Sequence, residues 1–427
     1  MNVAINAQFS LGGQAGGVES FTVALVAALG QLDDGPEEYV IIGPQDGSDW
    51  LKPYLAPNQR IVHPPRRPQR NTRLLEPARL LVQRVRSAVS HVSATTGRWP
   101  DIPISDGFYE SLGCEVVHFP YQQFVLCALP TVYNPHDLQH VHYPQFFKPA
   151  AIAWRETIYR AGCHFSQTVV AGSQWVKDDI VEHYGVSPQK VQVIPWAPPT
   201  QAYPEPTHDT LMAVRGKYQL DQPFALYPSV TWEHKNHMRL LEAIALLRDR
   251  HGLIVHLVCT GHKNDFWPRI EQRLLELGLS DQVRFLGVVP GEELRALYRL
   301  AQFVVIPSLF EAASGPLFEA WQEGAPAACS TVTSLPEQAA DAALLFDPLS
   351  VEAIADALAT MSTKPGLRED LVKKGARRLQ DFSWERTARA YRAVYRRAGG
   401  HPLSEEDHWL LGWDWMRQPR REQGQPE

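Results

Sequence analysis

The first residues of the chain constrain its fold most, because a short apolar run is followed by a glycine-rich stretch and then by a segment of helical composition. The apolar run is Val3-Ala4-Ile5, the glycine-rich stretch covers 11–17, and the expected helix covers about 18–32. Strand, glycine-rich loop and helix in this order are typical of the first unit of a doubly wound α/β sheet. The sequence therefore predicts an α/β protein that begins with a buried strand.

Short apolar runs recur along the chain, and most are separated by enough residues for a helix. These runs lie at 39–42, 116–119, 131–133, 168–171, 191–194, 224–227, 254–258, 283–286 and 303–306. Helical patterns follow Lys235, Trp267 and Gly291 in the second half. Continuous apolar strands that alternate with helices favour parallel sheets covered on both faces.

Chain length and one interruption of the pattern predict two domains. The chain has 427 residues, two to three times the length of a typical domain. A polar, proline-rich stretch at 195–223 is expected to be a linker or domain crossing. We therefore expect Rossmann-like domains at 1–200 and 201–382, followed by C-terminal helices at 383–427. Three tryptophans of this last segment, at 409, 413 and 415, are expected to dock on the body, and only 418–427 to be free.

Composition and charge exclude several classes of protein. The net charge is -6, so no overall basic field exists to hold nucleic acid. The five cysteines form no C-x-x-C pair, which argues against both a disulfide framework and a zinc module. No apolar stretch approaches the roughly 20 residues of a membrane span, and the N-terminus lacks a basic leader. We expect a cytoplasmic protein without a nucleic-acid partner.

Two glutamates after the apolar run 303–306 are candidates for ligand binding. Glu311 ends the loop after this run, and Glu319 lies eight residues later in a helix that Gly315-Pro316 would begin. Both carboxylates are expected to point into the crevice beyond the carboxyl ends of the strands, where doubly wound sheets bind ligands. A carboxylate there accepts hydrogen bonds from sugar hydroxyls. Solvated or capping glutamates produce the same spacing by chance, so the spacing alone decides nothing.

The residues around these glutamates resemble the family 4 glycosyltransferases of the GT-B fold, a group 1 glycosyltransferase-like pattern. The main match is Glu311-Ala-Ala-Ser-Gly-Pro-Leu-Phe-Glu319, the Glu-x7-Glu motif. Further matches in family order are Gly16-Gly17-Val18-Glu19, His136-Asp137, Val170-Ala-Gly-Ser173, Glu233-His-Lys-Asn-His237, Phe285-Leu-Gly-Val-Val289 and Ser334-Leu-Pro-Glu337. The resemblance extends over about residues 1–398. It implies two Rossmann-like, doubly wound parallel-sheet domains that face each other across a cleft.

The resemblance also implies the reaction. It is the retaining transfer of a sugar from a nucleotide diphosphate sugar to a glycan, lipid-linked or small-molecule acceptor, as in polysaccharide biosynthesis. The domain at 1–200 would lie on the acceptor side, the domain at 201–382 would bind the nucleotide sugar, and 383–427 would cross back to the first domain. The pattern Trp232-Glu-His-Lys-Asn-His237 is similar to members that use GDP-mannose, so mannose is a candidate sugar. Two alternatives stay open: a GT-B-fold sugar-nucleotide epimerase or hydrolase, and a nucleotide-sugar-binding protein without turnover.

Roles for three catalytic residues follow from the same resemblance. Glu311 would contact the hydroxyls of the donor sugar, and His136 would face that sugar across the cleft. Lys235 would neutralise the charge that grows on the leaving diphosphate. A structural role in a loop is the alternative for His136, because the chain has 16 histidines.

The donor-binding residues implied by the resemblance surround these three. They are Glu319, Gly16, Gly17, Ser314, Gly315, Leu317 and Gly287. Glu319 would bind the ribose hydroxyls, and the main-chain amides at 314, 315 and 317 would face sugar hydroxyls or the diphosphate. Gly16 and Gly17 would let the first loop approach that phosphate.

The chain departs from the family pattern at two places. The family usually has an arginine five or six residues before the lysine, where this chain has Ser229 and Val230. Either Lys235, with Arg239 nearby, neutralises the diphosphate charge without that arginine, or the donor binds in a different geometry. The usual Gly-Phe-Gly-Leu-Pro between the glutamates is here Ala312-Ala-Ser-Gly-Pro316, which lacks the aromatic residue.

No metal or other cofactor is expected. GT-B enzymes generally act without a metal, and the chain contains no Asp-x-Asp. A metal site at His136, His140 and His142 is disfavoured. The segment 137–143 that joins these histidines adds only one acidic ligand, Asp137.

An arginine-rich segment gives the one clue to the acceptor. Nine arginines lie between Arg60 and Arg98, against the single acid Glu76, and Pro77 could start an amphipathic helix there. Such a helix can contact an anionic membrane or a lipid-pyrophosphate acceptor at the cytoplasmic membrane face. It can equally be a core-facing helix with solvated arginines. The expected partners are thus a nucleotide-sugar donor and a glycan or lipid-linked acceptor, with peripheral membrane contact through this segment.

Overall fold

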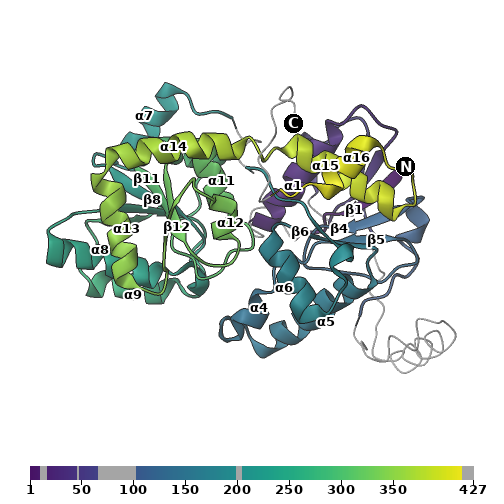
Figure 1. Cartoon of the computed structure of the whole chain (residues 1–427), viewed down its shortest axis with the longest axis horizontal. Coiled ribbons are helices and arrows are strands. Elements are labelled where there is room, and N and C mark those ends of the chain that lie inside the picture. Colours follow the sequence, from purple (N-terminus) through teal and green to yellow (C-terminus); the bar gives the residue numbers. More distant parts are fainter. Residues whose placement is uncertain (10–16, 46–47, 66–101, 199–203, 416–427) are drawn as a thin grey trace, which may run out of the picture.

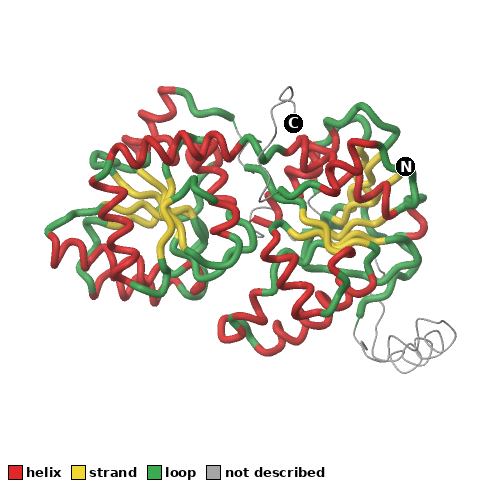
Figure 2. Tube along the Cα trace, in the orientation of Figure 1, coloured by secondary structure: helices red, strands yellow, loops and turns green. Residues whose placement is uncertain are grey.

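The computed structural model describes residues 1–9, 17–45, 48–65, 102–198 and 204–415. Two α/β domains lie side by side, each built around one sheet (Figure 1). The strands occupy the centre of each domain and the helices surround them (Figure 2). The predicted fold class, two doubly wound parallel-sheet domains, is confirmed.

The N-terminal sheet has seven strands in the order β3-β2-β1-β4-β5-β6-β7, all paired in parallel. They are β1 (Asn2–Asn6), β2 (Glu38–Ile42), β3 (Gln59–Val62), β4 (Val116–Phe119), β5 (Thr131–Tyr133), β6 (Thr168–Ala171) and β7 (Val191–Val193). The helices of this domain are α1 (Gly17–Gly30), α4 (Gln139–His142), α5 (Pro149–Phe165) and α6 (Gln174–Tyr184), with short 3-10 helices η1 (Asp49–Tyr54), η3 (Glu110–Leu112), η4 (Pro144–Phe146) and η5 (Pro188–Lys190). Because both faces of the sheet are covered, its central strands are mostly apolar and buried.

The C-terminal sheet has six parallel strands in the order β10-β9-β8-β11-β12-β13. They are β8 (Phe224–Pro228), β9 (His256–Thr260), β10 (Val283–Phe285), β11 (Phe303–Ile306), β12 (Ala327–Ser330) and β13 (Leu344–Phe346). Its helices are α7 (His208–Lys217), η7 (Glu233–Lys235), α8 (His237–His251), α9 (Trp267–Glu276), α10 (Gly291–Leu300), α11 (Gly315–Gln322), α12 (Leu335–Ala339), α13 (Val351–Thr363) and α14 (Pro365–Leu379). One face packs on α8 and α13, and the other on α10 and α11.

The strands β3, β12 and β13 were not expected from the sequence. β3 lies at an edge of its sheet and is only partly buried, so it lacks a continuous apolar run. β12 is built of small residues, and β13 begins with two leucines, which favour a helix as readily as a strand, so neither gives a strand signal. Part of the expected linker 195–223 forms α7, whose N-terminus is capped by the Thr207 hydroxyl. Two predictions fall on segments outside the described residues. Most of the arginine-rich segment lies in 66–101, and the expected free end lies in 416–427.

The last two helices, α15 (Trp384–Ala398) and α16 (Glu405–Gly412), pack on the N-terminal domain beside α1 (Figure 1). Trp384 donates from Nε1 to the carbonyl oxygen of Pro198, and the Thr387 hydroxyl donates to that of Pro195. The two chain segments that pass between the domains are therefore hydrogen-bonded to each other. Of the three C-terminal tryptophans, Trp415 is fully buried in this core. No helix among the described residues is long and apolar enough to cross a membrane.

A buried polar network joins α15 to the N-terminal sheet. His118 of β4 donates from Nε2 to Asn134 Oδ1 (2.8 Å), and its Nδ1 accepts from the Tyr395 hydroxyl (2.8 Å). The Asn134 amide donates in turn to the Tyr391 hydroxyl (2.6 Å). Burial lowers the pKa of His118 to about 3, so the imidazole is neutral and both of its nitrogens have partners.

We expect Tyr395→Phe to destabilise the N-terminal domain by about 1–3 kcal/mol, because it leaves the buried Nδ1 of His118 without a donor. Tyr39→Phe is the matched control: the ring of Tyr39 lies beside Tyr395, but its buried hydroxyl has no hydrogen-bond partner in the described part of the chain. Removing that hydroxyl should leave stability unchanged or raise it. Guanidinium unfolding followed by circular dichroism measures both, and equal effects of the two substitutions would contradict the network.

Candidate active site

An ion pair marks the carboxyl ends of the C-terminal strands. Lys235 ends η7 in the loop after β8, and Glu311 lies in the loop after β11. Lys235 Nζ is 2.6 Å from Glu311 Oε1. The lysine side chain is 19% exposed and that of the glutamate 8%, so the pair is largely shielded from water but still reachable from it. The two residues predicted to be catalytic in this domain are thus in contact.

The lysine loop is held by hydrogen bonds from two neighbours. Asn236, with a φ of 61°, adopts the left-handed conformation that ends η7 and precedes α8. Its side-chain amide donates to the carbonyl oxygens of Pro307 (2.9 Å) and Pro348 (2.8 Å). The Tyr227 hydroxyl donates to the carbonyl oxygen of Lys235 (2.7 Å). These bonds set the direction of the lysine side chain before any ligand binds.

The loop that carries Glu311 is also held by hydrogen bonds, most of them from the loop after β12. The Thr333 hydroxyl accepts from the Glu311 amide (3.0 Å) and donates to its carbonyl oxygen (2.6 Å). Ser334 donates to the same carbonyl (2.8 Å). The Ser308 hydroxyl donates to Glu311 Oε1 (2.6 Å). The backbone and the carboxylate of Glu311 are therefore both fixed by hydroxyl groups, and all three hydroxyls belong to residues that were not predicted to be in the site.

One expected donor contact needs correction. The amide of Ser314 donates to Gln338 Oε1 (2.8 Å), and its carbonyl accepts from Gln338 Nε2 (2.8 Å). This amide is therefore already used and is not directed at a ligand in this structure. Gly315 and Leu317 lie in the first turn of α11, where backbone amides have no partner within the helix. The partial positive charge of this helix end remains next to Glu311.

Glu319 lies deeper than Glu311. It is only 8% exposed and sits on α11, where it accepts a hydrogen bond from the Tyr298 hydroxyl of α10 (2.5 Å). Burial raises the pKa of the Glu319 carboxyl to about 7, against the hydrogen bond from Tyr298, which lowers it. The two glutamates thus have different partners, and their shared use of one ligand stays a prediction.

His136 lies on the N-terminal side, after β5. Its φ is 66°, and Nε2 donates to the carbonyl oxygen of Pro120 (2.6 Å), which leaves Nδ1 as the acceptor nitrogen. Burial lowers the pKa of this imidazole, so it is neutral. The ring meets Phe21 and Trp196 edge-on, with centroids 5.4 and 5.5 Å away.

Trp196 is a residue of this region that the sequence analysis missed. It stacks on Phe21 of α1 and packs against the cores of both domains. A Cβ placed on Gly17 or Gly172 would lie 3.7 or 3.3 Å from its ring, and the Gly172 position is 3.6 Å from Ala313 Cβ. The N-terminus of α1 and the Glu311 loop therefore meet around Trp196. The sequence signal that could have identified Trp196 is its place between Pro195 and Pro198, in the stretch expected to be a linker.

Further contacts cross between the domains near the Glu311 loop. The Tyr143 hydroxyl donates to the carbonyl oxygen of Leu309 (3.0 Å). The amide of Trp175 in the first turn of α6 donates to Glu337 Oε1 of α12 (3.0 Å). These contacts hold the loop before Glu311 against the N-terminal domain.

The two remaining glycine predictions have different outcomes. Gly287, after β10, has a φ of 73° and accepts from the Gly261 amide (2.8 Å). A Cβ on Gly261 would come within 2.6 Å of the Ser229 backbone, so these loops are in close contact. The backbone of Ser229 and Val230 therefore lies against Gly261, and neither side chain carries a charge. Gly16 lies outside the described residues.

The histidines considered together as metal ligands have separate partners. His136 donates to Pro120, His140 Nε2 lies 2.8 Å from Glu156, and His142 Nε2 lies 2.7 Å from Asp179. They do not form one group.

Comparison with known protein families agrees with this geometry. A family profile described as glycosyl transferases group 1 matches residues 213–378, and one described as glycosyltransferase family 4 matches residues 15–197. The chain therefore belongs to these glycosyltransferases, enzymes that transfer a sugar from a nucleotide sugar to an acceptor. The resemblance read from the Glu-x7-Glu motif is confirmed, as is the expectation of an enzyme.

Individual relatives are distant. The chain is 28% identical to O-antigen chain mannosyltransferase B of Escherichia coli over 266 residues, 61% of this chain and 69% of that protein. It is 30% identical to the MMP alpha-(1->4)-mannosyltransferase of Mycolicibacterium hassiacum over 224 residues, 52% of this chain and 51% of that protein.

Solved structures share the fold at low identity. Anabaena HepE in complex with UDP-glucose has a TM-score of 0.66 at 16% identity, with 93% of this chain and 100% of that chain covered. WaaG, a glycosyltransferase involved in lipopolysaccharide biosynthesis, has a TM-score of 0.63 at 16% identity with the same coverage. Sucrose-phosphate synthase from Thermosynechococcus elongatus has a TM-score of 0.65 at 20% identity, covering 93% and 98%.

We expect Glu319→Gln to stabilise the C-terminal domain at pH 8 by up to about 3 kcal/mol. The folded-state pKa of about 7 exceeds the ordinary value of 4.5, so the wild type loses stability as the pH rises through this range. Glutamine keeps an acceptor for Tyr298 without the buried charge. Denaturant unfolding at pH 5 and pH 8 measures this, and a difference that does not grow with pH would contradict the assigned burial.

Proposed function

We propose that this chain transfers mannose, with retention of anomeric configuration, from a nucleotide diphosphate sugar to a glycan, lipid-linked or small-molecule acceptor. The observation that carries the proposal is the fixed Lys235–Glu311 pair beside the N-terminus of α11. A cation and a helix N-terminus at one place are suited to a diphosphate, and the adjacent carboxylate is suited to sugar hydroxyls.

Mannose is proposed on two grounds. The pattern around Lys235 is similar to that of enzymes using GDP-mannose, and two relatives are named mannosyltransferases. Other relatives are named D-inositol 3-phosphate glycosyltransferase, and HepE has been solved with UDP-glucose. The nucleobase is therefore the first property to measure.

The proposed step forms a bond between the acceptor oxygen and the anomeric carbon and breaks the bond between that carbon and the leaving phosphate oxygen. The acceptor proton passes to a phosphate oxygen of the donor. Lys235 stabilises the charge on the departing diphosphate, and Glu311 positions the sugar. Neutral His136 offers Nδ1 as an acceptor from the N-terminal side. These groups act as preorganised charges and dipoles, so no side-chain nucleophile and no metal is required.

Ribose binding by Glu319 is part of the proposal. Its buried carboxylate would exchange part of its present environment for hydroxyl donors. The raised pKa of Glu319 is consistent with a group that lacks such donors before the nucleotide binds. Lys235 would act without the arginine common in the family, since Ser229 and Val230 occupy that place.

We also propose contact of the acceptor side with a membrane through the arginines between 60 and 98. This part rests on the sequence, since 66–98 lies outside the described residues.

A thermal-shift series with UDP, GDP, ADP and their sugar conjugates tests the donor site without an acceptor. A ligand that binds only the folded state raises the free energy of unfolding by mass action, by about 2.7 kcal/mol at a hundred times its Kd, and so raises the melting temperature. We expect GDP and GDP-mannose to give the largest shift in the wild type, and Glu319→Ala to abolish it. No shift with any nucleotide at millimolar concentration would overturn the proposed donor site.

Measuring the rate of sugar transfer distinguishes the role of Glu311 from that of Lys235. We expect Glu311→Gln to lower kcat by about 10²–10³-fold with little change in nucleotide affinity, because the amide lacks the charge that acts in the transition state. Lys235→Met should lower both kcat and nucleotide affinity. Lys217→Met is the matched control, because Lys217 forms a similar pair with Glu293 on the outer surface (2.8 Å). Unchanged sugar transfer in Glu311→Gln, measured by product analysis with and without acceptor, would refute the assignment.

A further inference from the structure

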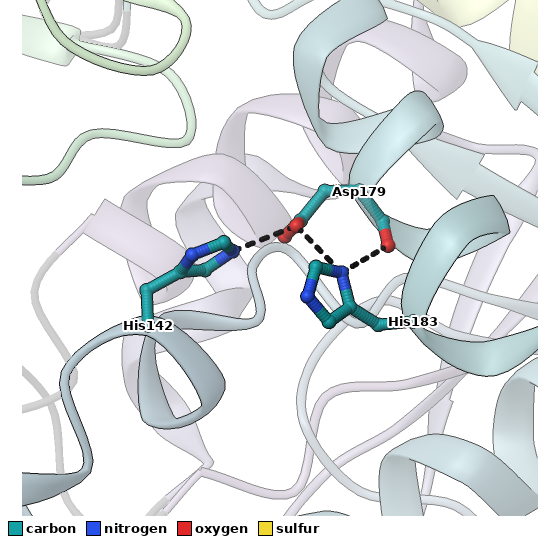
Figure 3. A group of neighbouring side chains, drawn as sticks. All are labelled: His142, Asp179 and His183. Carbon is teal, nitrogen blue, oxygen red and sulfur yellow. Dashed lines mark hydrogen bonds and ion pairs between the residues drawn. The ribbon is translucent and has the colours of Figure 1, made fainter.

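A second cluster of chemically reactive side chains lies in the N-terminal domain, apart from the Lys235–Glu311 pair. His142 ends α4, and Asp179 and His183 lie one turn apart on α6. His142 Nε2 is 2.7 Å from Asp179 Oδ1, and His183 Nδ1 is 3.0 Å from the same oxygen. Both rings are directed at the carboxylate (Figure 3). One ligand atom from each residue lies within 4.8 Å of the other two.

The carboxylate of this cluster is buried without enough partners. The Asp179 side chain is 4% exposed, and its Oδ2 has no hydrogen-bond partner among the described residues. Burial raises the pKa of Asp179, and it outweighs the hydrogen bond from His142. The two histidine side chains are 28% and 29% exposed, which leaves a path for an ion from solvent. A buried carboxylate oxygen without a partner, beside two imidazoles, points to a missing cation.

We propose that His142, Asp179 and His183 form a binding site for one divalent transition-metal ion of the Zn²⁺ type. The ligands are His142 Nε2, an Asp179 carboxylate oxygen and His183 Nδ1. Tetrahedral zinc with bonds of about 2.0–2.2 Å holds its ligand atoms about 3.3 Å apart. The two nitrogen–oxygen separations, 2.7 Å for His142 and 3.0 Å for His183, therefore need to open by about 0.3–0.6 Å. Three protein ligands leave one position for water.

The proton positions are compatible with this change. His183 Nδ1 also lies 3.0 Å from the Asp179 carbonyl oxygen, so it carries the proton in this structure. On metal binding, each histidine moves its proton to the other ring nitrogen, and each ligating nitrogen presents its lone pair. Imidazole with carboxylate selects a transition metal over Mg²⁺ or Ca²⁺, which prefer oxygen ligands alone.

The site would fasten α4 to α6 where the two domains meet. His142 packs against Trp175 and Phe310, with ring centroids 5.4 and 5.7 Å away, and Phe310 directly precedes Glu311. A bound ion would order the surface that receives the Glu311 loop. It lies outside the proposed transfer chemistry, so its presence and the proposed function can fail separately.

The test is to measure Zn²⁺ binding to the full chain by calorimetric titration. The visible spectrum of the Co²⁺-substituted protein then reports the geometry of the site. We expect one tight site per chain, and a tetrahedral Co²⁺ band. His142→Phe keeps an aromatic ring beside Trp175 and Phe310 but removes the ligand, and should weaken binding at least about 10-fold. His183→Ala should do the same.

The matched control is His251→Ala, which removes an exposed histidine at the end of α8. It should bind Zn²⁺ as the wild type does, with the same rise in melting temperature. Equal affinity of His142→Phe and the wild type would overturn the proposal, as would the absence of a one-to-one site at micromolar Zn²⁺.

Discussion

Parallel pairing of the strands is the constraint on which the rest of this structure depends. Parallel neighbours require a crossover connection, so helices cover both faces and the carboxyl ends of all strands open at one edge. Loops far apart in the chain meet there. Lys235 follows β8, Glu311 follows β11, and Thr333 follows β12, yet they are joined by hydrogen bonds and one ion pair. The site is thus a consequence of topology as much as of residue type.

The two domains are coupled at the place where the chain passes between them. Trp196 packs against both cores, and α15 returns to the N-terminal domain with hydrogen bonds to the Pro195 and Pro198 carbonyls. The Glu311 loop also contacts Tyr143 across the interface. A change in the relative position of the domains would therefore alter the contacts of Trp196 and of Glu311 together, and so both sides of the proposed donor site.

The charges of the site illustrate how burial and function oppose each other. Glu319 carries a carboxylate in an apolar setting, with one hydrogen bond from Tyr298, at a cost in stability that a neutral side chain would not have. Asp179 in the N-terminal domain is likewise a buried carboxylate, and one of its oxygens has no hydrogen-bond partner within the described ranges. Groups left under-satisfied in this way are suited to a ligand that supplies the missing donors or charge.

Periodicity and spacing were enough to determine the fold class, since most strands of both sheets are continuous apolar runs and the Glu-x7-Glu motif marks the family. The same signals missed β12 and β13, because a strand of small residues or of leucines without β-branched neighbours is recognised only once its neighbours bury it. Tertiary structure alone decided that the Ser314 amide bonds to Gln338, that Trp196 joins the domains, and that His142 meets Asp179 across 37 residues of sequence. Hydrogen bonds and ligand clusters depend on distances in space. A single sequence gives the order of the residues along the chain. Which residues come into contact is decided by how the helices and strands pack.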